Sequence, residues 1–130
     1  MTTASNSMIA RGNPLTVAMD TASIDEVDAT GLAEQFPDVQ FAFADTAADL
    51  ATAIAKSDVV FGKRLPYESI VGAPRVRWVQ AGTAGVDALL SRGPWPSRVT
   101  LTNARGAHGT PMAEQVIAMM LAFATRLHVL

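Results

Sequence analysis

The sequence predicts an α/β fold with a five-stranded parallel sheet and helices on both faces. Short apolar runs bounded by turn residues alternate along the chain with segments of helical character, the pattern of β–α–β units whose sheet is buried on both faces. The 130 residues are 49% hydrophobic and 17% charged, which suits one globular domain with a sizeable core. Crossovers between parallel strands are expected to be right-handed.

Five runs rich in β-branched and aromatic residues are expected to be strands: 15–19, 39–43, 58–62, 76–79 and 99–102. The segments between them predict helices at 25–36, 47–55, 67–71 and 86–90. Pro37 should end the first of these helices, and the Thr46 hydroxyl should cap the second. Thr110 is expected to cap a long final helix with Pro111 at its first position.

Composition excludes several classes of function. A net charge of −2 with scattered cations gives no footprint for nucleic acid or for a membrane surface. The absence of cysteine and the presence of only two histidines argue against disulfides and against a metal site. No signal-peptide pattern and no apolar run of about 18 residues occurs, so we expect a cytoplasmic protein.

The most informative stretch runs from the fourth strand through Gly82, Thr83, Ala84 and Gly85 into a helix. Small residues there would let main-chain N–H groups approach a ligand. Such donors at a helix start suit a carboxylate or a phosphate. The alternative is a tight turn that binds nothing.

Ligands of parallel sheets bind at the carboxyl ends of the strands. That rule places three loops on one rim: 63–65, 81–85 and 103–109. Arg64 is a candidate partner for an anionic substrate, and the alternative is a solvated arginine. Asp87 and His108 could act as acid or base, but beside helix starts we interpret both as structural, Asp87 as a cap or dipole partner.

Two aspartates suggest a receiver domain, a regulatory protein, as an alternative. Asp20 and Asp45 follow the first two strands, as the phospho-acceptor region of a receiver domain would. A receiver also needs clustered acids after the first strand and a lysine after the fifth, where Asn103 and Arg105 occur instead. The receiver interpretation is therefore weak.

The final helix is apolar nearly all round, which predicts that it is buried nearly all round. One stripe comprises Ala113, Val116, Ile117, Met120, Leu121, Ala124 and Leu127, and a second comprises Met112, Met119 and Phe123. A five-stranded domain covers only one side of such a helix. We therefore expect a larger protein or an obligate interface, with a homodimer through the second stripe as the alternative.

Three ordered motifs carry a family resemblance: APRVRWVQ at 73–80 with AGVD at 84–87, TNARGAHG at 102–109, and MAE at 112–114. From about Leu15 to Leu127 the chain resembles the N-terminal, substrate-binding half of D-isomer-specific 2-hydroxyacid dehydrogenases. The likeness is greatest to the branch of glyoxylate and hydroxypyruvate reductases.

The resemblance implies a flavodoxin-like catalytic domain that packs across a cleft against a Rossmann domain binding NAD or NADP. The loop matching Thr83, Ala84 and Gly85 would hold the substrate carboxylate, and Arg64 and Leu65 would line the same cleft. Thr110 would approach the nicotinamide, and the long helix would cross between the domains. The family's catalytic arginine, glutamate and histidine match nothing in this chain, and His108 is not the catalytic histidine.

These observations divide the chain into a tail (1–13), a flavodoxin-like catalytic domain (14–109) and a linker helix (110–130) directed toward a missing Rossmann domain. The expected partners are a small 2-oxo or 2-hydroxy acid and that domain. The expected function of the larger protein is NAD(P)-dependent reduction of a 2-oxo acid, with this chain alone inactive. The alternative is a stand-alone flavodoxin-like module that binds an anion or a protein partner.

Overall fold

The computed structural model describes residues 14–23 and 26–129, so the expected tail at 1–13 lies outside the described residues. Five parallel strands form one sheet in the order β2-β1-β3-β4-β5, which is the flavodoxin-like order. The strands are β1 (Leu15–Asp20), β2 (Val39–Ala44), β3 (Val59–Gly62), β4 (Trp78–Ala81) and β5 (Thr100–Asn103). The α/β fold class predicted from the sequence is confirmed.

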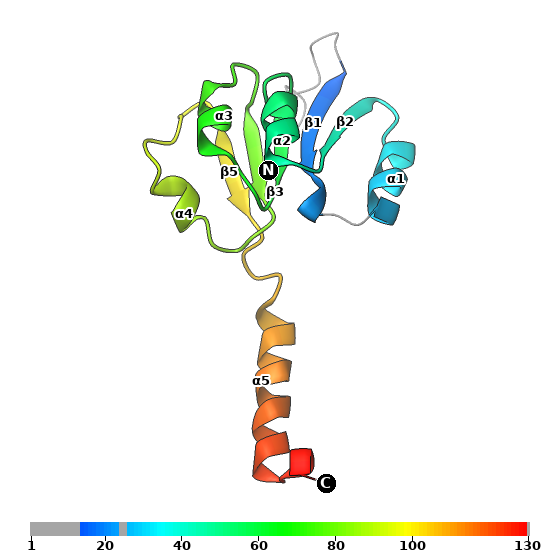
Figure 1. Ribbon diagram of the computed structural model, residues 1–130, viewed down its shortest axis with the longest axis vertical. Helices are drawn as coiled ribbons and strands as arrows, with labels where there is room; N and C mark the ends of the chain where they lie inside the picture. Colours follow the sequence, from blue (N-terminus) through cyan, green and yellow to red (C-terminus); the bar gives the residue numbers. More distant parts are fainter. Residues whose placement is uncertain (1–13, 24–25, 130) are drawn as a thin grey trace, which may run out of the picture.

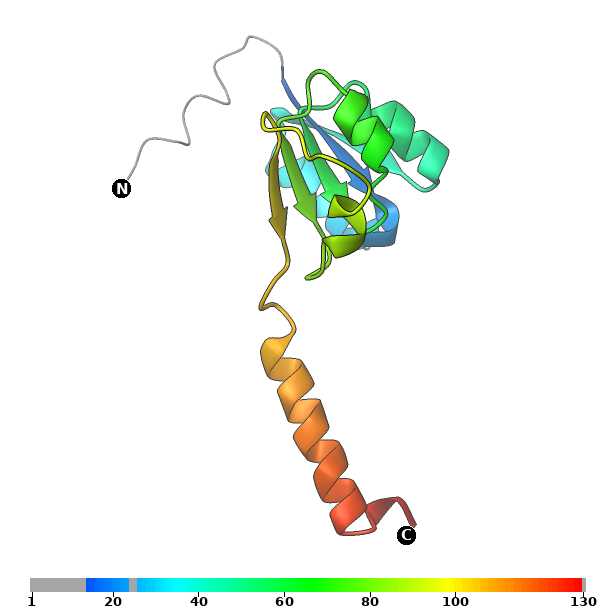
Figure 2. The ribbon, with the colours of Figure 1, turned by 90° about the vertical axis from the view of Figure 1, so that its left-hand side faces the viewer.

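Helices connect the strands in the expected places. They are α1 (Glu26–Gln35), α2 (Ala47–Ile54), α3 (Tyr67–Gly72), α4 (Asp87–Leu90) and α5 (Gly109–Ala124), with 3-10 turns η1 (Thr21–Ser23) and η2 (Leu127–Val129). Figures 1 and 2 show α2 and α3 on one face of the sheet and α1 beside β2 on the other. Thr46 caps α2 as predicted, since its hydroxyl accepts a hydrogen bond from the Asp49 amide at 3.2 Å.

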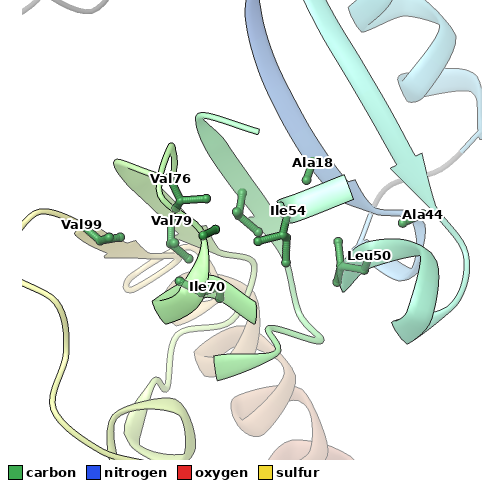
Figure 3. Close-up of a cluster of buried hydrophobic side chains, with 10 residues drawn as sticks. Ala18, Ala44, Leu50, Ile54, Ile70, Val76, Val79 and Val99 are labelled. Atoms are coloured by element: carbon green, nitrogen blue, oxygen red, sulfur yellow. The ribbon is translucent and has the colours of Figure 1, made fainter. Parts of the chain in front are cut away.

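The main core lies between the sheet and the α2–α3 layer (Figure 3). Ala18, Val60 and Val79 face it from neighbouring strands, because the parallel register pairs Ala18 with Val60 and Val60 with Val79. The helices contribute Leu50, Ile54 and Ile70, each no more than 1% exposed. Alternation along the strands therefore directs one set of side chains to this core.

The helix α5 begins one residue before the predicted cap. The Met112 amide donates to the His108 carbonyl at 3.1 Å, so His108 occupies the N-cap position. Thr110 therefore lies inside the first turn and is not the cap. The prediction of a Thr110 cap is wrong because the turn closes earlier, on a residue whose own side chain caps nothing.

The expectation that α5 is buried is not met within this chain. None of its residues is buried, and Figures 1 and 2 show it extending away from the sheet. The large apolar side chains of α5 and η2 that remain exposed are Met112, Val116, Ile117, Met119, Met120, Leu121, Phe123, Leu127 and Val129. Among the described residues, no helix is both long and apolar enough to cross a bilayer.

The ends of β1 and β3 approach each other closely at Asp20 and Gly62. A Cβ atom on Gly62 would lie 2.5 Å from the Asp20 Cβ, which is far inside van der Waals contact. Asp20 is fully buried and its carboxylate is fixed by hydrogen bonds, so it has no room to move aside. Glycine is required at position 62 for this steric reason.

We therefore expect Gly62→Ala to lower the free energy of unfolding by about 2–3 kcal/mol, the cost of overpacking a tight site. The matched control is Gly31→Ala in α1, where a Cβ would meet nothing within 4 Å. That change should raise stability by about 0.5–1 kcal/mol. Urea unfolding followed by circular dichroism measures both, and equal effects of the two substitutions would contradict the steric account.

Candidate functional site

An open cleft of about 540 Å³ lies at the carboxyl ends of the central strands. Its walls are formed by the loop after β3 and by the loop and helix after β4. The residues that line it are Ala47, Lys63, Arg64, Leu65, Pro66, Ala81, Thr83, Gly85, Val86, Ala88, Leu89 and Arg92. The cleft is therefore on the rim where a parallel sheet binds its ligands.

Four of the site residues predicted from the sequence, Arg64, Leu65, Thr83 and Gly85, line this one cleft. Ala84 belongs to the same loop but is not among the lining residues. Thr110 does not line the cleft; it is exposed in the first turn of α5. The structure thus brings the predicted substrate-binding segments together and leaves the predicted cofactor contact outside.

The loop from 82 to 86 is held by its carbonyl oxygens. The Ala104 amide donates to the Thr83 carbonyl at 3.0 Å, and Asn103 Nδ2 donates to the Ala84 carbonyl at 2.6 Å. The Gly85 carbonyl accepts from the Thr83 hydroxyl at 2.8 Å. By contrast, the amides of Thr83, Ala84 and Gly85 donate to no acceptor within the described part of the chain, so these N–H groups are available to a ligand.

The small residues of this loop have different roles. A Cβ on Gly82 would lie 3.3 Å from Lys63 Cγ, so Gly82 makes room for the stem of that lysine. A Cβ on Gly85 would meet nothing closer than Asp87 Oδ2 at 3.8 Å, and neither glycine has a left-handed φ. The tight contact with Lys63 therefore favours glycine at position 82, whereas position 85 has room for a Cβ.

Asp87 and His108 do not line the cleft. Asp87 lies in the first turn of α4, where its negative charge interacts favourably with the helix dipole. The N-cap residue is Val86, and no side chain forms a capping hydrogen bond to that helix. The prediction that Asp87 caps the helix is therefore wrong, whereas its place beside the helix dipole is as expected. His108 is exposed and, in the part of the chain that the structure describes, its side chain makes no capping bond to α5.

A buried ion pair fixes the wall after β3. Asp20 is completely buried at the end of β1, and its Oδ1 accepts from Arg64 Nε at 2.9 Å and also from Arg64 Nη2. Its Oδ2 accepts from the amides of Lys63 and Arg64 at 3.2 and 2.9 Å. The guanidinium reaches further, to the Asp45 carbonyl at 3.1 Å. One carboxylate thus holds both the backbone and the side chain of this loop.

The pKa of Asp20 reflects this arrangement. Burial by itself would raise it, but the hydrogen bond from the Arg64 side chain and those from the Arg64 and Ala22 amides outweigh burial and lower the pKa to about 2. Asp20 is consequently ionised at every physiological pH. A wholly buried carboxylate engaged on both oxygens is unavailable for phosphorylation, which argues against a receiver domain.

Sequence reasoning missed the partner of Arg64, because the pair spans 44 residues of chain. An acid at the end of one central strand and an arginine just after the next was the available signal. It placed Lys63 on the rim without giving it a role and missed Arg92, and both residues line the cleft with Arg64. The lining set holds three cations and no carboxylate, so the cleft favours an anion.

Comparison with known proteins adds to this geometry. No family model matches the chain. A protein of Streptomyces coelicolor, described as an uncharacterized protein in the mprR 3′ region, is 44% identical over 57 residues, which are 44% of this chain and 20% of that protein. A D-isomer specific 2-hydroxyacid dehydrogenase family protein from Aeromonas salmonicida matches 90% of the chain with a TM-score of 0.72 and 23% identity.

Phosphoglycerate dehydrogenase from Lactobacillus plantarum matches 86% of the chain with a TM-score of 0.55 and 25% identity. The chain folds like part of a 2-hydroxyacid dehydrogenase. The fold that the resemblance implied is thus confirmed in three dimensions. The chain spans 38% and 36% of the lengths of the two solved proteins, so it corresponds to less than half of either.

The Asp20–Arg64 pair predicts a specific dependence of stability on pH. The pKa of Asp20 falls from 3.8 to about 2 on folding, so its ionised form stabilises the fold fully above pH 3.8 and ceases to do so as pH falls toward 2. At about 1.4 kcal/mol for each pKa unit, the contribution is about 2 kcal/mol. Asp20→Asn should therefore be less stable than the parent at neutral pH.

Urea unfolding of both proteins between neutral pH and pH 2 measures the stability gap between them. We expect the gap to narrow below pH 3.8. Asp58, whose pKa is also lowered because hydrogen bonds and Arg75 outweigh its burial, is present in both proteins, so its titration cancels. A gap that stays constant across this range would refute the assigned role of the Asp20 charge.

Proposed function

We propose that this chain is the substrate-binding part of an NAD(P)-dependent oxidoreductase that reduces a 2-oxo acid to a D-2-hydroxy acid. The observation that carries the proposal is a loop whose Thr83, Ala84 and Gly85 amides donate to no acceptor among the described residues, and whose Thr83 and Gly85 line a cleft with three cations and no acid. The structural likeness to 2-hydroxyacid dehydrogenases supports it. Within that family we propose the branch acting on glyoxylate and hydroxypyruvate.

A 2-oxo acid carries its carboxylate next to the carbonyl that is reduced. Hydrogen bonds from the loop amides to that carboxylate are charge-assisted and directional, so they would fix the carbonyl in one orientation. Arg64, clamped by Asp20, would add positive charge to the opposite wall, and Leu65 would exclude water there. This part of the protein would contribute positioning, which lowers the entropy cost of reaching the transition state.

The sequence contains no G-x-G-x-x-G dinucleotide fingerprint. Thr110, the one cofactor contact expected from the resemblance, is exposed on α5 and lies outside the cleft. NAD or NADP would supply the hydride, held mainly by a Rossmann domain outside this chain. The exposed apolar surface of α5 supports a linker helix that packs against that domain.

A second candidate is a stand-alone module that binds an anion on the same amides and a protein partner through α5. The exposed apolar side chains of α5 favour it, since an exposed apolar surface of this extent marks an interaction site. The downstream reading frame distinguishes the two candidates, because a strand, a G-x-G-x-x-G loop and a helix encoded there would support the oxidoreductase.

The amide site is tested by titrating the ¹⁵N-labelled chain with glyoxylate. We expect the largest amide shifts at Thr83, Ala84 and Gly85. Gly85→Pro, which removes one N–H, should weaken binding by about tenfold or more, the value of a hydrogen bond to a charged group. The matched control is Gly85→Ala, which keeps the N–H and introduces no contact under 3.8 Å; it should bind like the parent. Shifts confined to other loops would contradict the proposed site.

An activity assay tests whether the chemistry resides in a domain other than this chain. We expect the 130-residue chain alone to produce no NADH oxidation in the presence of glyoxylate or hydroxypyruvate, because the residues for hydride transfer and proton donation are assigned to the other domain. Absorbance at the NADH maximum measures this. Turnover above the buffer control by the purified chain would overturn the assignment of chemistry to another domain.

A further inference from the structure

Three consecutive carbonyl oxygens of the loop after β4 are hydrogen-bonded within the protein. The Thr83 oxygen accepts from the Ala104 amide at 3.0 Å, and the Ala84 oxygen accepts from Asn103 Nδ2 at 2.6 Å. The Gly85 oxygen accepts from the Thr83 hydroxyl at 2.8 Å. Two of the three donors, Asn103 Nδ2 and the Ala104 amide, therefore come from the end of β5 and from the residue after it.

These hydrogen bonds determine the direction in which the loop amides point. In a trans peptide unit the carbonyl and the N–H of the next residue point in opposite directions, and the described residues contain no cis peptide bond. Strand β4 lies between β3 and β5. The cleft lies on the β3 side of the loop, since in the described part of the chain no residue of β5 or of the connection after it lines the cleft. Carbonyls held toward β5 thus direct the Ala84 and Gly85 amides toward the cleft.

One of these peptide units can reverse without a steric penalty. Reversal of a peptide unit rotates ψ of the residue before it and φ of the residue after it by roughly half a turn. The Ala84–Gly85 unit is followed by glycine, which adopts a left-handed φ at little cost. The Thr83–Ala84 unit is followed by alanine, whose Cβ disfavours that region. Gly85 has no left-handed φ in the structure, so the hydrogen bond to the Ala84 carbonyl accompanies the orientation that directs the Gly85 N–H toward the cleft.

We propose that Asn103 is a positioning residue of the anion site, whose hydrogen bond to the Ala84 carbonyl holds the Ala84–Gly85 peptide with its N–H toward the ligand. The inference rests on the proposed function, because it takes the loop amides to bind the carboxylate of a 2-oxo acid. Without Asn103 the peptide reverses in part of the population and directs the Ala84 oxygen toward the cleft, where it repels an anion. The Ala104 amide cannot replace Asn103, because it holds the preceding peptide unit.

The test titrates ¹⁵N-labelled chains with glyoxylate. Asn103→Leu removes the donor at nearly constant size and should weaken binding about fivefold, because a hydrogen bond of ordinary strength then no longer favours the binding orientation. Asn103→Ala removes the same donor with a smaller side chain and should give the same result. The ratio of the sequential Hα–HN and HN–HN nuclear Overhauser effects between Ala84 and Gly85 reports ψ of Ala84. This ratio should change in both variants without ligand.

A second substitution separates reversal of the peptide from general damage to the fold. Alanine at position 85 disfavours the left-handed φ that reversal requires by about tenfold, and it introduces no contact under 3.8 Å. Asn103→Leu combined with Gly85→Ala should therefore bind glyoxylate nearly as tightly as the parent. If Asn103 contributed only to stability, Gly85→Ala would restore nothing, so a double variant that regains no affinity refutes the inference.

The matched control is Thr102→Val, at the neighbouring position of β5. The Thr102 hydroxyl donates to Gln80 Oε1 at 2.6 Å and accepts from Trp78 Nε1 at 2.8 Å. The substitution thus removes side-chain hydrogen bonds from the same strand and leaves those of the loop carbonyls in place. It should change neither the affinity for glyoxylate nor the ratio of the two Overhauser effects. An equal loss of affinity in Thr102→Val and Asn103→Leu would assign the effect to disturbance of β5 and refute the inference.

The outcomes distinguish this inference from the proposed function. If glyoxylate shifts the Thr83–Gly85 amides of the parent and Asn103→Leu binds it equally well, the role of Asn103 is refuted and the proposed function stands. If glyoxylate does not shift those amides in the parent, the proposed function fails and the role of Asn103 fails with it.

Discussion

The cleft depends on one buried carboxylate. Asp20 ends the central strand β1 and accepts hydrogen bonds from the Arg64 side chain and from the Lys63 and Arg64 amides. Burying such a charge is costly unless it is paired and fully hydrogen-bonded, and here both oxygens are engaged. The same hydrogen bonds hold the loop after β3 in place. They therefore compensate the buried charge of Asp20 and also form the first wall of the cleft. Gly62 is the steric condition for this arrangement, because a Cβ there would occupy the place of Asp20.

In the opposite wall, the loop after β4 is held by hydrogen bonds to its backbone carbonyls. The Thr83 and Ala84 carbonyls accept hydrogen bonds from Asn103 at the end of β5 and from Ala104 just after it. These bonds anchor the loop, while the amides of Thr83, Ala84 and Gly85 have no acceptor among the residues that the structure describes. An anchored loop with unused donors loses little entropy when an anion binds. The wall after β3 contributes side-chain charge and the wall after β4 contributes main-chain donors, so the two present different chemistry to one ligand.

Sequence alone predicted the strands, the helices and the Thr46 cap, because apolar runs and capping residues act locally. It also predicted that Arg64 and the Thr83–Gly85 loop share a rim, since strand direction determines that. The partner of Arg64 escaped prediction because, although the flavodoxin-like order makes β1 and β3 neighbours, strand order does not show which side chains meet at their ends. The start of α5 was misplaced by the general preference for threonine caps, and the roles of Gly82 and Gly85 differ only because Lys63 crosses one of them.

The exposed helix α5 is linked to the cleft through its connection to β5. That connection starts at Asn103 and Ala104, whose side-chain and main-chain amides hold the Ala84 and Thr83 carbonyls. It then turns at Gly106, which has a φ of 90°, a conformation that favours glycine. The start of the connection to α5 is therefore anchored on the loop that bears the free amides. A partner that covers the apolar side chains of α5 would therefore be joined to this loop through a connection that two hydrogen bonds and one glycine shape.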